Sequence, residues 1–269
     1  ALRRRAAGCA GLPRLLSWGF HLGKPYAVTD LLGWDLTRLV PFLAPRPLQQ
    51  RWRAVRAVGR MVLRALRAVH RGGYVHCDVS PLNVLLGREP GGGPADVVPH
   101  LIDFGIAEKF PGGAAHGAWH GTMEFTSLRT AAGGERVRED DFEALGWTLV
   151  FLLFGELPWM ECLRVDWGKV SVLDLARRRE EVAAEVARGK RQLLEGGWDA
   201  LGPPWDGLAD LPEGLEGLLQ ACRVETRPPE EPDYARLAAL LGQRQGLGPE
   251  EAEREDRREL RDHLLALLL

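Results

Sequence analysis

Cysteine, charge of one sign and long hydrophobic runs are all scarce in this sequence of 269 residues. The four cysteines, Cys9, Cys77, Cys162 and Cys222, form no Cys-x-x-Cys pair, which argues against a disulfide framework or a cysteine zinc site. We therefore expect reduced thiols, as in a cytoplasmic or nuclear protein. The 35 Lys and Arg residues nearly balance the 37 Asp and Glu residues, so the net charge implies no nucleic-acid partner.

No apolar stretch is long enough to cross a membrane. The longest, residues 144–154, is about half of the ~20 residues that a membrane-spanning helix needs. It predicts instead a helix that is buried on all sides. No signal peptide is visible. Because the sequence starts at Ala1, without methionine and inside an arginine-rich helical pattern, we expect a fragment, a truncated gene product or a processed product.

The predicted elements are a few short strands followed by helices. Strands are predicted at residues 14–18, 26–29, 74–76, 84–86 and 98–102. Helices are predicted at residues 48–70, 141–154, 171–195, 213–222, 233–241 and 250–268. The first of these helices should end at Gly72 and Gly73. This order predicts an α+β or mainly α fold.

Two polar clusters carry the predicted chemistry. Residues 76–83 read His-Cys-Asp-Val-Ser-Pro-Leu-Asn, and residues 101–105, after one predicted hairpin, read Leu-Ile-Asp-Phe-Gly. Asp78 is the candidate base that would orient a hydroxyl group and accept its proton during phosphoryl transfer from ATP. Asn83 and Asp103 supply the hard oxygen atoms that Mg²⁺ requires. Taken alone, Asp78 would be interpreted as a loop residue that caps backbone N–H groups.

Further segments resemble one protein family. Residues 121–127, Gly-Thr-Met-Glu-Phe-Thr-Ser, resemble the end of the activation segment in the casein kinase 1 group of protein kinases, especially the vaccinia-related kinases. Residues 138–146 with 155–159 are similar to the central helix of that group, and residues 31–33 resemble its hinge. The resemblance extends over roughly residues 8–242.

The resemblance implies an α+β, protein-kinase-like fold with a mainly helical C-lobe, short β hairpins and a remnant of the N-lobe sheet. Residues 1–33 would be this remnant and the hinge, and residues 34–243 the C-lobe. Residues 244–269 would be a C-terminal helical extension. We expect its apolar end to pack against the lobe rather than to bind a membrane surface or a partner.

The resemblance also implies where ATP would bind. Thr29 would be the gatekeeper, and the backbones of Asp30 and Leu32 would face the adenine. Leu85 would cover the adenine face, and Ile102, directly before Asp103 in the sequence, would also line the nucleotide site.

Two further residues are expected to hold the site together. His76 would stack on Phe104 in an internal column rather than act as a base. Asp141 would begin the central helix and anchor the catalytic-loop backbone, a place where the helix dipole also favours a carboxylate.

Three departures from the family pattern bear on activity. Cys77 replaces the usual arginine before the catalytic aspartate. Ser80, retained as a candidate catalytic residue, replaces a lysine whose charge on the transferring phosphoryl group would contribute roughly a few kcal/mol. Upstream of the hinge the sequence has no glycine-rich phosphate loop and no phosphate-binding lysine. We therefore expect residues 1–269 alone to bind ATP weakly or not at all and to expose apolar surface where more of an N-lobe would sit.

Three functions remain open. Asp78, Asn83 and Asp103 favour a serine/threonine protein kinase that uses ATP and Mg²⁺ on a protein substrate. Cys77 and Ser80 favour a pseudokinase that serves as a binding scaffold. A small-molecule phosphotransferase of the aminoglycoside or choline kinase type has a similar loop, but the segments at 121–127 and 140–146 argue against it.

Overall fold

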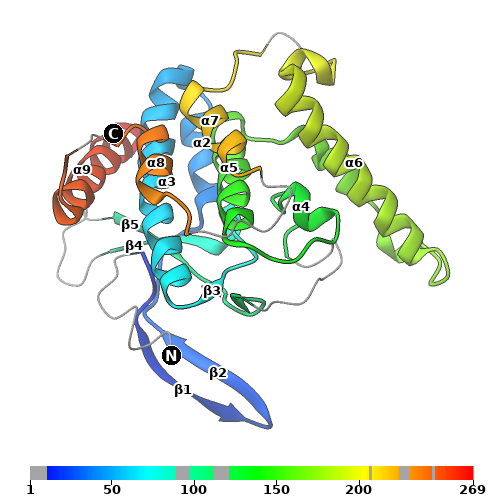
Figure 1. Ribbon diagram of the computed structural model, residues 1–269, viewed down its shortest axis with the longest axis horizontal. Coiled ribbons are helices and arrows are strands. Elements are labelled where there is room, and N and C mark those ends of the chain that lie inside the picture. Colours follow the sequence, from blue (N-terminus) through cyan, green and yellow to red (C-terminus); the bar gives the residue numbers. More distant parts are fainter. Residues whose placement is uncertain are drawn as a thin grey trace.

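The computed structural model describes residues 11–88, 97–111, 121–205, 208–223, 231–243 and 246–268. The described residues form a body of helices and three two-stranded antiparallel sheets, one of which projects from the body as a ribbon (Figure 1). The α+β architecture expected from the sequence is therefore confirmed.

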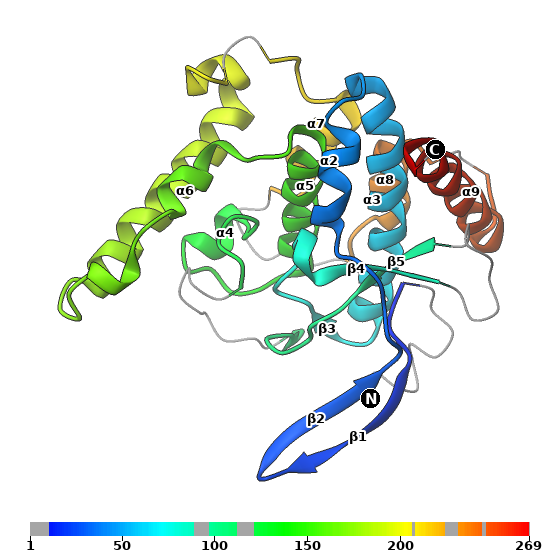
Figure 2. The ribbon, with the colours of Figure 1, turned by 180° about the vertical axis from the view of Figure 1, so that it is seen from behind.

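The helical body is built around the two helices α3 (Leu48–Arg71) and α5 (Arg138–Phe154), which pack against each other. Its other α-helices are α2 (Val40–Leu43), α4 (Leu128–Ala131), α6 (Leu175–Gly196), α7 (Glu213–Ala221), α8 (Tyr234–Leu240) and α9 (Pro249–Leu268). Short 3₁₀ turns lie between the helices and strands: η1 (Leu36–Leu39), η2 (Pro81–Asn83), η3 (Pro158–Leu163), η4 (Trp167–Lys169) and η5 (Trp198–Leu201). α5 packs against α3, α2 and α7, and Figure 2 shows α2 and α3 beside it from behind.

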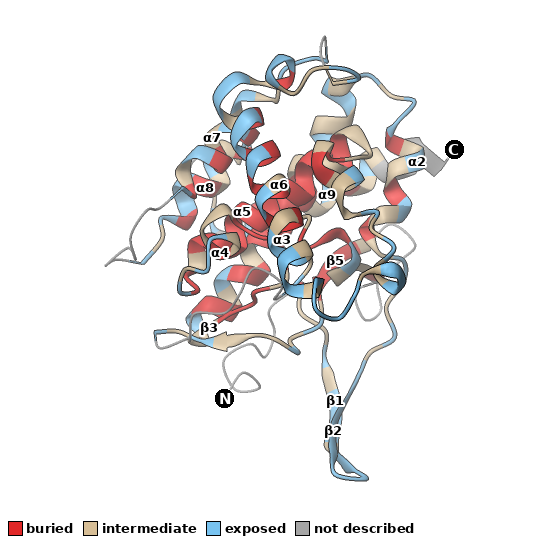
Figure 3. Ribbon diagram, turned by 90° about the vertical axis from the view of Figure 1, so that its right-hand side faces the viewer, coloured by how far each residue is buried: buried red, intermediate tan, exposed pale blue. Residues whose placement is uncertain are grey.

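The central helix α5 is buried along nearly its whole length, as Figure 3 shows, which confirms the buried helix expected at residues 144–154. Two glycines permit its close packing. A Cβ atom on Gly59 of α3 would lie 2.9 Å from Leu149 Cδ1, and one on Gly146 would lie 2.5 Å from Leu219 Cδ2 of α7. Larger side chains at these positions would therefore separate the three helices.

The three sheets are β1 (Leu15–His21) with β2 (Lys24–Thr29), β3 (Tyr74–Val75) with β6 (Glu108–Lys109), and β4 (Val84–Arg88) with β5 (Val97–Leu101). Leu22 and Gly23 connect β1 to β2 with positive φ angles of 49° and 76°, as a two-residue hairpin turn requires. The ribbon exposes large apolar side chains: Leu16, Trp18, Phe20, Leu22, Tyr26 and Val28. Exposed apolar surface was expected where more of an N-lobe would sit, and the ribbon does expose apolar side chains.

The segment after the ribbon is fixed on the edge of β4. The Gly33 N–H donates to the Leu86 carbonyl oxygen at 2.7 Å, and the Leu86 N–H donates to the Trp34 carbonyl oxygen at 2.7 Å. A Cβ atom on Gly33 would lie 2.6 Å from that Leu86 oxygen, so only glycine allows this approach. Asp35 continues the pairing with a bridge to Leu85.

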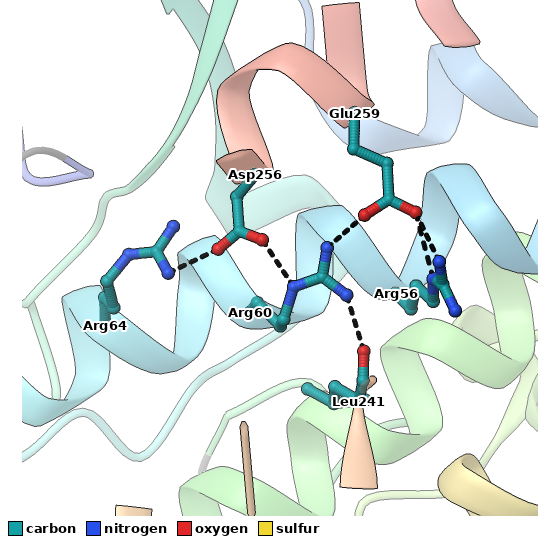
Figure 4. A network of polar contacts seen from close by, with 6 residues as sticks. All are labelled: Arg56, Arg60, Arg64, Leu241, Asp256 and Glu259. Atoms are coloured by element: carbon teal, nitrogen blue, oxygen red, sulfur yellow. Dashed lines mark hydrogen bonds and ion pairs between the residues drawn. The ribbon is translucent and has the colours of Figure 1, made fainter. Parts of the chain in front are cut away.

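The helices α6 and α9 lie on opposite flanks of the body (Figures 1 and 2). α9 packs along α3. The packing expected for its apolar end concerns residues 264–269, whose side chains lie outside the described part of the chain. Figure 4 shows the polar network between α3 and α9, in which Arg56, Arg60 and Arg64 of α3 pair with Asp256 and Glu259 of α9. Among the described residues no helix has the length and apolar character needed to cross a membrane.

The structure also contains elements that the sequence did not predict. β3 was predicted at residues 74–76, but its partner β6 and the short helix α4 were missed, and α6 begins at Leu175 rather than near Ser171. The Ser171 hydroxyl accepts from the Leu173 N–H at 3.2 Å, and its carbonyl oxygen accepts from the Asp174 N–H at 2.9 Å. These local bonds form a turn that delays the start of the helix.

Candidate functional site

The candidate base Asp78 lies in the loop between β3 and β4, and its carboxylate is held on both oxygens. Oδ1 accepts from the N–H and the hydroxyl group of Thr122, each at 2.7 Å. Oδ2 accepts from the Asn83 side-chain amide at 2.8 Å, and this amide also donates to the Asp78 carbonyl oxygen at 2.9 Å. Asp78 and Asn83 are therefore brought together, and the carboxylate has a single orientation.

Asp141, in the first turn of α5, anchors the backbone of this loop. Its carboxylate accepts from the N–H of His76 at 2.7 Å and from the N–H of Cys77 at 2.9 Å. It also lies 2.8 Å from His70 Nε2, while His70 Nδ1 lies 2.7 Å from the Tyr234 hydroxyl. The anchoring role expected for Asp141 is confirmed.

The charge of Asp141 should make stability depend on pH. Burial acts to raise the pKa of Asp141, but the bonds from His70 and the His76 backbone outweigh it, so the folded-state pKa lies below its ordinary value. A depressed carboxylate pKa adds stability above the unfolded value of ~3.9, and this stability disappears as the pH falls through the folded value. We expect Asp141→Asn to lower the free energy of unfolding by at least ~2 kcal/mol at pH 7.

Urea unfolding of both proteins between pH 7 and pH 3 tests this expectation. The difference between wild type and Asp141→Asn should be constant above pH ~5 and shrink progressively below pH ~4. A difference that stays the same down to pH 3 would show that the charge of Asp141 does not contribute.

His76 is a packed, neutral residue. Nε2 donates to the Ile102 carbonyl oxygen at 2.9 Å, and Nδ1 accepts from the Asp78 N–H at 3.3 Å, so the partners assign the tautomer. The ring contacts Phe104 edge-on, with 4.9 Å between centroids. Burial lowers the pKa of His76 despite the nearby carboxylates, of which Asp141 has the largest effect. The predicted contact of His76 with Phe104 is confirmed, although the rings meet edge-on rather than stacked, and both ring nitrogens of His76 are engaged.

Asp103 follows β5 and is exposed. Its Oδ1 accepts from the Gly105 N–H at 3.1 Å, a local bond that fixes the turn after it. The Ile102 N–H donates to the Asn83 backbone carbonyl oxygen at 2.9 Å. This bond places the start of β4, next to Asn83, beside the end of β5, from which Asp103 follows. Asp103, at φ 59°, and Cys77, at φ 71°, are two of the three described non-glycine residues with positive φ. This backbone conformation is unfavourable in free energy for such residues, and it is found most often at functional sites.

Two departures from the family pattern are buried rather than turned toward solvent. Burial raises the pKa of the Cys77 thiol, and the Sγ atom lies 3.5 Å from the Val75 carbonyl oxygen. Ser80 is completely buried, and its hydroxyl group has no hydrogen-bond partner among the described residues. Cys77 stands where the family has an arginine and Ser80 where it has a lysine. Both side chains are buried, whereas a charged side chain would reach solvent or the phosphoryl group.

The five residues expected around the nucleotide are Thr29, Asp30, Leu32, Leu85 and Ile102, and the structure distributes them unevenly. Leu85 and Ile102 are half-buried on β4 and directly after β5. Leu32 is half-buried and its side chain lies close to Gly87 of β4. A Cβ atom on Gly87 would lie only 2.6 Å from Leu32 Cδ2. Asp30 pairs with Arg14 at 3.0 Å, and Thr29 is exposed at the end of the ribbon.

The contact between Thr122 and Asp78 was not predicted. The segment 121–127 was recognised by its resemblance, but no pattern in the sequence indicates that Thr122 reaches a carboxylate 44 residues earlier. Gly121 makes the approach possible, since a Cβ atom there would lie 2.8 Å from the Cys77 carbonyl oxygen. The sequence shows a glycine at this position, but only the structure shows that Gly121 is needed for the approach.

Comparison with known proteins finds a matching family and related proteins. Residues 37–187 match the protein kinase domain family. The chain is 31% identical over 161 residues to a probable casein kinase I homolog from Encephalitozoon cuniculi, covering 57% of this chain and 48% of that protein. It is 32% identical over 161 residues to casein kinase I homolog 1 from Schizosaccharomyces pombe, covering 57% of this chain and 35% of that protein. The chain thus spans about half the length, or less, of the curated relatives it matches.

Proposed function

Because this chain belongs to the protein kinase domain family, with casein kinase I-like character, we propose that its site transfers the γ-phosphoryl group of ATP to serine or threonine hydroxyl groups of a protein. The observation that carries the proposal is the carboxylate of Asp78, which Thr122 and Asn83 hold in one orientation. A carboxylate fixed in this way can accept the proton of a hydroxyl group that approaches phosphorus.

The nucleotide would lie between the hinge and the β4–β5 hairpin. Leu32, Leu85 and Ile102 offer apolar contact for the adenine, and the backbones of Asp30 and Leu32 offer its polar partners. Thr29 would border this space as gatekeeper. The pairing of residues 33–35 with β4 supports this arrangement, because it fixes the distance between hinge and hairpin.

The donor atoms at Asn83 and Asp103 fit Mg²⁺. The side-chain nitrogen of Asn83 donates to Asp78, so the side-chain oxygen Oδ1 of Asn83 is the atom left for a cation. The Asp103 carboxylate is exposed. No group of three His, Cys, Asp or Glu side chains that could hold a metal occurs among the described residues, so water and phosphate oxygens would complete the coordination. Bound Mg²⁺ would neutralise charge on the phosphate oxygens.

Transfer of labelled γ-phosphate from ATP to casein tests the proposal. We expect Mg²⁺-dependent transfer by the wild type and a loss of at least ~100-fold in Asp103→Asn, because the amide removes the charge that attracts the cation. Circular dichroism should be unchanged, since Asp103 is exposed. Transfer that persists at full rate in Asp103→Asn or in the presence of EDTA would contradict the assignment.

The proposed activity of the 269-residue chain alone is slow. The buried Ser80 brings no positive charge to the phosphoryl group, and the sequence before the hinge brings no phosphate-binding lysine. These same features favour the second candidate function, a pseudokinase scaffold, which a complete lack of transfer would support. The free thiols of Cys77, Cys162 and Cys222 support a reducing compartment, cytoplasm or nucleus.

A further inference from the structure

Lys190 on α6 is a lysine with no solvent exposure. It occupies the buried face of the helix, in line with Val182 and Val186, where helical spacing would place another apolar residue. A buried ammonium group is costly unless its donors are used, so its partners indicate why it is there.

The ammonium group of Lys190 binds the chain segment that ends the activation segment. Nζ donates to the Thr126 carbonyl oxygen and lies 3.5 Å from that of Met123. It also lies 5.6 Å from the ring centroid of Trp147 and 5.4 Å from that of Trp159, within the range of cation–π attraction. Two carbonyl oxygens and two indole rings therefore surround the charge.

Two carboxylates face this lysine from neighbouring elements. Burial lowers the pKa of Lys190 to about 7, while Glu143 of α5 and Glu124 of the bound segment act to raise it. Glu143 also accepts from the Leu128 N–H at 2.9 Å, and the Trp159 indole N–H donates to the Glu124 carbonyl oxygen at 2.9 Å. Side chains from η3, α5 and α6 thus hold the backbone of residues 123–128.

A single turn connects this holding point to the candidate base. The Thr122 carbonyl oxygen accepts from the Phe125 N–H at 3.0 Å, and from the N–H and the hydroxyl group of Thr126, each at 3.1 Å. One end of the turn is Thr126, bound by Lys190, and the other is Thr122, bound by Asp78. Displacement of Thr126 would therefore move Thr122 and release the carboxylate.

We propose that Lys190 is a positioning residue that, through the turn at 122–126, keeps Thr122 on Asp78 and so fixes the surface on which a protein substrate lies. The inference deepens the proposed function and rests on it for its kinetic consequence, but not for the structural coupling. Lys190 acts from inside the helical body and does not touch substrate.

Amide hydrogen exchange resolved by NMR tests the coupling without any activity. In Lys190→Met, which keeps an unbranched side chain but removes the charge, we expect exchange of the Thr122, Phe125 and Thr126 amides to accelerate at least ~10-fold while α3 is unchanged. Lys169→Met is the matched control, because Lys169 is 86% exposed and pairs only locally with Asp166. Unchanged exchange at 122–126, or acceleration of equal size in α3, would overturn the proposal.

Steady-state kinetics then test the consequence. We expect Lys190→Met to lower kcat/KM for casein at least ~10-fold and to change KM for ATP by less than ~2-fold. A parallel loss on both substrates would overturn the positioning role. If the wild type transfers no phosphate, the proposed function fails, and the exchange experiment still decides the coupling.

A second variant covers the case in which Lys190→Met does not fold. Trp159→Phe keeps an aromatic ring near Lys190 but removes the N–H that binds the Glu124 carbonyl oxygen. It should accelerate exchange at 122–126 by about 3-fold or more, again without effect on α3. Exchange equal to that of the wild type would overturn the proposal, since the segment would then be held without these contacts.

Discussion

Asp78→Asn is expected to reduce phosphoryl transfer to casein at least ~10³-fold, because the amide has nearly the same shape but cannot accept the proton of the hydroxyl group. It also replaces one of the two oxygens that accept hydrogen bonds from Thr122 and Asn83 with an NH₂ group, which can only donate. The measurement is transfer of labelled γ-phosphate from ATP at saturating Mg²⁺. The loss should lie in kcat, since the side chain is not part of the proposed adenine contacts.

The control for this variant is Asp174→Asn at the start of α6. Its carboxylate is 52% exposed and pairs with Arg177, far from any candidate residue in the sequence. Asp174→Asn should therefore retain the wild-type rate. If Asp78→Asn kept more than about a tenth of the wild-type rate, Asp78 would not be the base, and if the wild type had no rate to lose, the scaffold interpretation would be preferred.

The helices could be predicted from the sequence because their own residues determine them. In α3 the apolar residues recur at helical spacing, and Gly73 ends the helix with a φ angle of 83° that other residues avoid. α5 was recognised because residues 144–154 have no polar face. The ribbon was predicted at both strands, although the ribbon buries little apolar surface.

Elements that depend on distant contacts could not be predicted in the same way. β3 was predicted at residues 74–76, but β6 is only two residues long and is defined by its pairing with β3, so nothing local indicated it. The short helix α4 starts after Ser127, whose hydroxyl group accepts from the Thr130 N–H at 3.0 Å. A capping serine was visible in the sequence, but four residues carry too little periodicity to predict a helix.

The site shows the same division. Asp78 and Asn83 are five residues apart, so one local motif was enough to pair them, and the structure joins them at 2.8 Å. Thr122 and Lys190 are far from Asp78 in the sequence, and only the folded chain brings Thr122 to Asp78 and Lys190 to the Met123 carbonyl oxygen. The sequence does show that a lysine interrupts the apolar face of α6 at position 190. The exposed arginines of the same helix instead form surface ion pairs such as Arg177–Glu181.

The network between α3 and α9 should yield the largest change in stability. Arg60 and Asp256 are each only 2% exposed and form an ion pair, and Arg64 binds the second oxygen of Asp256 (Figure 4). Asp256→Ala would leave the Arg60 charge buried with its remaining bonds to Glu259 and the Leu241 carbonyl oxygen. Removing one partner of a buried pair costs about 3–5 kcal/mol, and we expect the lower end of this range.

Urea unfolding at pH 7 measures this loss, with Asp262→Ala on the same helix as the matched control. Asp262 is 57% exposed and pairs with its neighbour Arg261, so its removal should change the free energy of unfolding by less than ~0.5 kcal/mol. If both variants lost the same small amount, α9 would not depend on the buried pair for its docking. The urea m-value reports the surface that is exposed in the transition. If Asp256→Ala lowered this m-value but left the unfolding midpoint of α3 unchanged, α9 would separate from the body before the rest of the protein unfolds.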